Sequence, residues 1–130
     1  MARVFVDTSA MYALLDRDDT HHADASARFE QLKKARAEPV LSNFVVAETH
    51  ALLLARLGRA VAREWLLGNI WHVERVSEDD EHKAREIIAG YTDKDFSFTD
   101  ATSFALMERL HLRRALAFDR HFRQYGFQID

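Results

Sequence analysis

The chain has 130 residues, 48% of them hydrophobic, which fits one domain that buries its own core. It contains no cysteine, which excludes disulfides and thiolate metal sites and makes a reducing compartment the natural setting. A net charge of −3 weighs against nucleic acid as a partner on overall charge alone.

Strand-like and helical patterns alternate along the chain. In chain order, we expect a strand over 3–6, helices over 10–16 and 21–36, a strand over 39–41, helices over 44–58 and 59–69, a strand over 71–76, helices over 77–91 and 99–112, a strand over 115–118, a short helix over 120–125 and a last strand over 127–129. Ser42 and Asn43 are start signals for the helix over 44–58, and Gly58 ends it.

This alternation predicts an α/β fold, with a mostly parallel sheet and helices on both faces. The short interior strands lack polar alternation, as expected when both faces of a sheet are covered. There is no repeat or linker, so one domain over residues 1–130 is predicted. No apolar run approaches the roughly 20 residues that cross a bilayer, and the first residues do not resemble a signal peptide. We expect a cytoplasmic protein that has no membrane partner.

Asp7 lies where the first expected strand ends and the first helix begins. Asp7 or Ser9 could simply cap that helix, because their side chains accept hydrogen bonds from the unpaired amides of a first turn. The carboxyl end of a parallel strand is also where α/β proteins place their chemistry. This stretch alone leaves both interpretations open.

Three other acids share this kind of position. Asp119 follows the strand over 115–118, so it should lie at the same sheet edge as Asp7. Asp100 stands at the start of a helix after "FSFT". Glu48 is in the first turns of an otherwise apolar helix, where partial burial of a carboxylate is costly unless it is paired.

Carboxylates brought close together raise one another's pKa, and a divalent cation removes that conflict. Oxygen ligands without cysteine, and without a zinc-type histidine spacing, suit Mg²⁺ or Mn²⁺. Such a site could activate a water and stabilise the charge that develops on a phosphate. Taken singly, Asp100 could only cap its helix and Asp119 could only begin a turn.

The remaining polar residues include histidines, clusters of basic residues and two acids in a loop. Simple structural or surface roles are expected for His21, His22, His50 and His82. The basic groups at 33–36, 109–114 and 120–123 could be solvated helix faces or the rim of an acidic pocket that binds a phosphate backbone. Asp93 and Asp95 fit loop acids, although one of them could add a ligand or touch a substrate.

Four segments, "VFVDTSAMYALLD", "VVAET", "FSFTDATSFALM" and "ALAFDRHF", resemble the PIN-domain ribonucleases, in particular the VapC-like toxins of prokaryotic type II toxin–antitoxin pairs. The resemblance covers nearly the whole chain in the family's order. It implies a parallel five-stranded sheet, Mg²⁺- or Mn²⁺-dependent cleavage of RNA, a homodimer and inhibition by a small antitoxin protein.

By the same resemblance, the family's acidic quartet, which is catalytic, corresponds to Asp7, Glu48, Asp100 and Asp119. Asp7 and Asp100 would be the main metal ligands, and Glu48 and Asp119 would complete the pocket directly or through water. Hydroxyls that could orient these ligands are those of Thr8, Ser9 and Thr99.

Rival classes fit less well. A phosphoryl-receiving domain needs an acidic neighbour for Asp7 and a late lysine, but no lysine follows Lys94. A haloacid-dehalogenase-like phosphatase needs an acid where Ser9 stands. The remaining alternative is a PIN-like nucleic-acid-binding or RNA-processing module, with a degenerate site or without a toxin role.

Overall fold

The computed structural model describes residues 2–68 and 70–130, which form five strands and seven helices. The strands are β1 (Arg3–Val6), β2 (Glu38–Ser42), β3 (His72–Glu74), β4 (Arg114–Leu116) and β5 (Gln128–Ile129). The helices are α1 (Thr8–Leu15), α2 (His22–Lys34), α3 (Asn43–Leu57), α4 (Arg59–Gly68), α5 (Glu78–Gly90), α6 (Phe98–Arg109) and α7 (His121–Tyr125). The order of elements expected from the sequence is confirmed.

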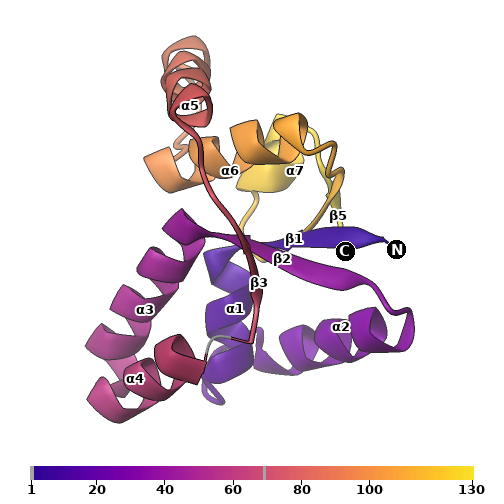
Figure 1. Cartoon of the computed structure of the whole chain (residues 1–130), viewed down its shortest axis with the longest axis vertical. Helices are drawn as coiled ribbons and strands as arrows, with labels where there is room; N and C mark the ends of the chain where they lie inside the picture. The colour runs from indigo at the N-terminus through magenta and orange to yellow at the C-terminus, as the bar shows by residue number, and fades with distance from the viewer. Residues whose placement is uncertain (1, 69) are drawn as a thin grey trace.

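The five strands form one sheet in the order β3-β2-β1-β4-β5, and every pairing is parallel. Figure 1 shows α1 to α4 on one face and α5 to α7 on the other, so the predicted α/β architecture is confirmed. The chain runs outward from β1 in one direction through β2 and β3, and later in the other through β4 and β5. In such sheets the crevice for ligands opens at the carboxyl ends of the strands where the order reverses, here between β1 and β4.

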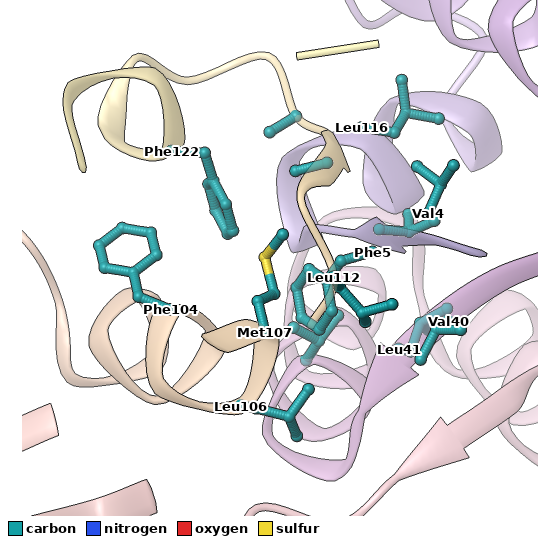
Figure 2. Close-up of a cluster of buried hydrophobic side chains, with 14 of the residues drawn as sticks. Val4, Phe5, Val40, Leu41, Phe104, Leu106, Met107, Leu112, Leu116 and Phe122 are labelled. Atoms are coloured by element: carbon teal, nitrogen blue, oxygen red, sulfur yellow. The ribbon is translucent and has the colours of Figure 1, made fainter. Parts of the chain in front are cut away.

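The core packs against the central strands (Figure 2). Val4, Phe5 and Val6 are fully buried because helices cover both sides of β1. On the α6 side, the Phe104 ring packs edge-to-face on Phe122, with ring centroids 5.0 Å apart. These contacts hold α6 firmly, and so they fix the direction in which its first turn approaches the carboxyl edge of the sheet.

The helix signals read from the sequence are also confirmed. The Ser42 side chain accepts a hydrogen bond from the Val45 N–H at 3.1 Å, so it caps α3. Gly58 ends α3 with φ of 94°, a left-handed conformation that favours glycine. Asn69, the expected last residue of the fourth helix, lies outside the described residues, and α4 ends at Gly68.

Three strands, β3, β4 and β5, are shorter than expected. β3 lies at the edge of the sheet and pairs on one side only. β4 ends at Leu116, so Asp119 does not follow the strand directly. β4 ends early because the Phe118 N–H does not pair within the sheet and donates instead to the Ser9 hydroxyl at 3.0 Å.

Candidate active site

A cleft of about 370 Å³ opens where the carboxyl ends of β1 and β4 meet. All four acids singled out from the sequence line it: Asp7 after β1, Glu48 on α3, Asp100 on α6 and Asp119 after β4. The cleft is also lined by Thr8, Ser9, Tyr12, Asp19, His21, Leu52, Arg56 and Phe118. Segments far apart in the sequence therefore bring their carboxylates to one place.

Asp7 both caps α1 and belongs to the cleft, so the two interpretations of this residue are compatible. Its Oδ2 accepts the Ser9 N–H at 3.2 Å and the Ser9 hydroxyl at 2.7 Å. The Asp7 side chain is nevertheless buried, with the residue only 2% exposed. Capping explains the hydrogen bond that Asp7 accepts from the first turn of α1, but it does not explain why this carboxylate is buried away from water.

The environment of Asp7 disfavours its charge. Burial raises the pKa of the Asp7 carboxyl well above its ordinary value, and the nearby Asp119 raises it further. The hydrogen bond from Ser9 acts in the opposite direction, and Asp100 adds a smaller rise. A cation placed among these carboxylates would offset both the desolvation and the repulsion.

Asp100 also has a double role. Its Oδ2 accepts the Ser97 N–H at 3.0 Å while the Ser97 hydroxyl accepts the Asp100 N–H at 3.0 Å, which forms a capping box at the start of α6. Burial raises the pKa of Asp100, the Ser97 N–H lowers it, Asp119 raises it and His121 lowers it, with a net rise. The capping box fixes the carboxylate at the cleft.

His121 is a site residue that the sequence analysis missed, because it was counted only within a basic cluster. Its Nδ1 lies 2.7 Å from Oδ2 of Asp100 and 3.9 Å from Oδ1 of Asp119, and its backbone N–H donates to that Asp119 oxygen at 3.0 Å. Potential ligand atoms of Asp100, Asp119 and His121 lie within 4.8 Å of one another. The only available signal was its place two residues after Asp119.

Glu48 stands on the face of α3 that borders the cleft. It is half-buried, and Leu52 and Arg56 follow it at four-residue intervals and line the same cleft. The Arg56 guanidinium lies over the Tyr12 ring, 5.1 Å from its centroid. Among the described residues that line the cleft, Arg56 is the single lysine or arginine.

The basic clusters contribute no lysine or arginine to the described lining of this cleft. The Arg109 guanidinium binds Asp80, with an Nη2–Oδ2 distance of 2.9 Å, and Arg114 pairs with Asp130. Within the described part of the chain, the cleft-lining residues include none from the groups at 33–36, 109–114 or 120–123, although His121 contacts the cleft-lining Asp100. For the lysines and arginines of these groups, the interpretation as ordinary helix and strand surface fits the structure.

The structure separates the remaining polar candidates. Asp93 is exposed and pairs with Lys94 at 2.9 Å, and neither it nor Asp95 lines the cleft. The backbone oxygen of Thr99 accepts hydrogen bonds from the Thr102 and Ser103 hydroxyls within α6, and Thr99 is not among the described residues that line the cleft. His22 has a structural role, with Nδ1 2.8 Å from the Ala13 carbonyl oxygen.

The surroundings of the Thr8 hydroxyl indicate whether the cleft residues fit a metal ion. Its hydroxyl belongs to a residue 4% exposed that lines the cleft, yet no described protein atom is its hydrogen-bond partner. Buried hydroxyls normally have a partner, so this one suits a ligand or an ordered water. The Thr8 hydroxyl and the oxygens of the Asp7 and Asp100 carboxyl groups, whose pKa values are raised, together form a set of oxygen ligands typical of Mg²⁺ or Mn²⁺.

The fold and the cleft together define a class of protein: a parallel α/β domain with buried carboxylates where the strand order reverses. The sequence model of the PIN domain matches residues 4–128, and the chain belongs to the PIN-domain family. Every helix within the described residues is too short or too polar to cross a membrane.

Named relatives make the similarity more specific. The chain is 38% identical over 129 residues to "23S rRNA-specific endonuclease VapC20" of Mycobacterium tuberculosis, with 95% of each chain covered. It is 32% identical over 124 residues to "Ribonuclease VapC26" of the same species, covering 92% of this chain and 89% of that protein.

Solved structures agree. The crystal structure of M. tuberculosis VapC20, described as a Sarcin-Ricin loop cleaving toxin, superposes with a TM-score of 0.83 at 35% identity, with 95% of each chain covered. FitAcB of Neisseria gonorrhoeae matches with a TM-score of 0.71 over 97% of this chain and 95% of that chain. At 16% identity, the FitAcB match supports the fold alone.

Proposed function

We propose that this chain is an endoribonuclease that depends on Mg²⁺ or Mn²⁺ and acts as the toxin of a type II toxin–antitoxin pair. The observation that carries the proposal is the convergence of Asp7, Glu48, Asp100 and Asp119 on one cleft. The relatives named as ribonucleases, similar over nearly their whole length, support the same activity. An unused cluster of buried, mutually repelling carboxylates would only cost stability.

In this proposal, Asp7 and Asp100 hold the metal ion, and Glu48 and Asp119 complete the pocket directly or through water. A bound divalent ion supplies a water nucleophile at neutral pH and offsets negative charge on the phosphate. The chain's own contribution is positional. Ser9 holds the Asp7 carboxylate, the Ser97 capping box holds Asp100, and the backbone amide of His121 holds Asp119.

The proposal extends to substrate and partners. Ribosomal RNA is the first substrate to test, because VapC20 is named for 23S rRNA. We infer a homodimer that is inhibited by a small cognate antitoxin, as the family resemblance implies. RNA as the substrate favours action in the cytoplasm. The one PIN domain is inferred to span residues 1–130, slightly beyond the matched range of 4–128.

The test is cleavage of an RNA pool that contains ribosomal RNA by purified protein, with Mg²⁺, with Mn²⁺ and with a chelator. Asp100→Asn should lose cleavage because it removes a charged ligand while an amide oxygen can still serve the capping box. Asp93→Asn is the matched control, since Asp93 is an exposed acid outside the cleft.

The proposal is supported if cleavage requires the metal ion, persists in Asp93→Asn and is lost in Asp100→Asn. A folded wild-type protein that binds RNA and stabilises in Mn²⁺ but cuts none of the pool would contradict it. That result would favour the non-catalytic binding module.

A further inference from the structure

One wall of the cleft carries a stacked pair of rings outside the acidic cluster. The imidazole of His21 lies flat on the phenyl ring of Phe118, with centroids 4.7 Å apart and an angle of 4° between the planes. Both residues line the cleft, and His21 is exposed. The side chain of His21 makes no capping hydrogen bond to α2, so the start of that helix does not explain its position.

The backbone holds each ring in place. The Phe118 N–H donates to the Ser9 hydroxyl, which in turn donates to Asp7 at 2.7 Å. The His21 N–H donates to Oδ1 of Asp19 at 2.8 Å. The next residue, His22, is anchored with Nδ1 2.8 Å from the Ala13 carbonyl oxygen. The ring pair is therefore held on the same framework as the carboxylates.

The charge of the cleft limits how RNA can be held there. Among its described lining residues are five acids, Asp19 in addition to the four already named, against the single guanidinium of Arg56. Phosphate contacts alone would meet strong repulsion in this cleft, even with one divalent ion bound. Stacking of a nucleobase on aromatic rings adds binding energy without requiring positive charge, and single-stranded RNA is commonly bound in this way.

We propose that the His21–Phe118 ring pair is a stacking subsite for one nucleobase of single-stranded RNA next to the bond that is cut. The proposal rests on the ribonuclease function proposed above. The exposed imidazole extends the stack from Phe118, and it places the base near Asp119, the residue that follows Phe118. The subsite selects an unpaired nucleotide, because a base within a duplex cannot present its face to the ring.

The test uses a synthetic RNA of about 20 nucleotides that spans a bond cut by the wild-type protein, since stacking needs only a short single strand. The fluorescent base 2-aminopurine replaces each nucleotide next to that bond in turn. Its fluorescence, which is quenched by stacking, is followed on binding to the Asp100→Asn protein, alone and combined with His21→Ala or His21→Phe. Steady-state cleavage is measured in the otherwise wild-type background.

We expect quenching at one position beside the cut bond, its loss in His21→Ala and its retention in His21→Phe. His21→Ala should raise KM about 10-fold, the usual scale for one stacked base, and lower kcat less. The matched control is His82→Ala, which removes an exposed imidazole on α5 that is not among the cleft-lining residues and should not alter the quenching.

Cleavage and quenching by His21→Ala at wild-type levels would overturn the subsite while the ribonuclease proposal stands. Quenching lost equally in His21→Ala and His21→Phe would overturn stacking, because a planar ring would then not suffice. Absence of any cleavage by the wild-type protein would remove the proposed function and this subsite with it. Mn²⁺-induced thermal stabilisation should persist in both His21 variants, which separates the subsite from the metal site.

Discussion

The Ser9 hydroxyl accepts the N–H of Phe118 at 3.0 Å, although 109 residues separate the two in sequence. The same hydroxyl donates to Oδ2 of Asp7 at 2.7 Å. It thus joins the carboxyl ends of β1 and β4, the two strands between which the cleft opens. Through this one side chain, the first acidic segment and the last are held in register.

Ser9→Ala tests this bridge. The substitution leaves the Phe118 N–H without its partner and removes one of the two hydrogen bonds that Ser9 donates to the Asp7 carboxylate. We expect the free energy of unfolding to fall by about 1–3 kcal/mol and RNA cleavage to fall with it. Chemical denaturation and single-turnover cleavage measure the two effects. Unchanged cleavage at saturating metal would show that the bridge does not serve the site.

Asp7→Asn should separate stability from function. Burial and the Asp119 charge disfavour ionised Asp7, so an amide should raise the melting temperature of the metal-free protein at pH 7. The same change should abolish Mn²⁺-induced stabilisation and cleavage. Asn remains a good helix cap, so α1 should survive. A lower melting temperature without metal would contradict the electrostatic account.

The same raised pKa sets the sign of a pH effect. Native Asp7 keeps its proton to higher pH than unfolded Asp7, whose pKa is about 3.9. Between these two pKa values the native state binds more protons, so stability falls as pH rises through the window. The metal-free wild type should lose more stability over this rise than Asp7→Asn. Thermal melts in a chelator between pH 4 and pH 8 test this, and parallel curves would exclude Asp7 as the cause.

Thr8→Val replaces the buried, unpartnered hydroxyl by a methyl group of similar shape. The metal-free protein should be as stable as wild type or more stable, because no protein hydrogen bond is lost. If the hydroxyl orients a ligand of the metal ion, Mn²⁺ affinity should fall about 10-fold, the scale seen for groups that support metal ligands. Isothermal titration of Mn²⁺ measures this, and equal affinities would assign Thr8 no part in the site.

Asp80 provides a prediction away from the cleft. Burial would raise the pKa of Asp80, but the Arg109 guanidinium and the N–H of Ser77 outweigh it, so that pKa is lowered. Ionised Asp80 therefore contributes stability above the unfolded pKa of about 3.9, which is lost as pH falls through the native pKa. Asp80→Asn should cost about 2 kcal/mol at pH 7, because Arg109 is partly solvated, and less at pH 3. Urea unfolding at both pH values measures the difference, and an equal cost at both would contradict the assignment.

Local patterns were sufficient for the order of the elements and for the parallel α/β fold. Hydrophobic periodicity, the Ser42 cap and Gly58 each act over a few neighbouring residues, so a sequence shows them directly. The four acids also stood out from local patterns. Asp7 and Asp119, placed after strands, were predicted to share one edge of the sheet, and Glu48 and Asp100 were placed in the first turns of helices. Their catalytic and metal-binding roles remain predictions.

Tertiary structure decided what depends on distant contacts. No local signal shows that Ser9 forms a hydrogen bond with Phe118, that His21 stacks on the Phe118 ring, or that His121 approaches Asp100. Each pair comes together only when the sheet and its helices are assembled. Arg109 and Arg114, which the sequence left as candidates for binding phosphate, form ion pairs with Asp80 and Asp130 in the structure. Sequence alone thus established the elements and the chemical types at their ends. Only packing decided which side chains share the cleft, since that depends on the order and spacing of strands far apart in the chain.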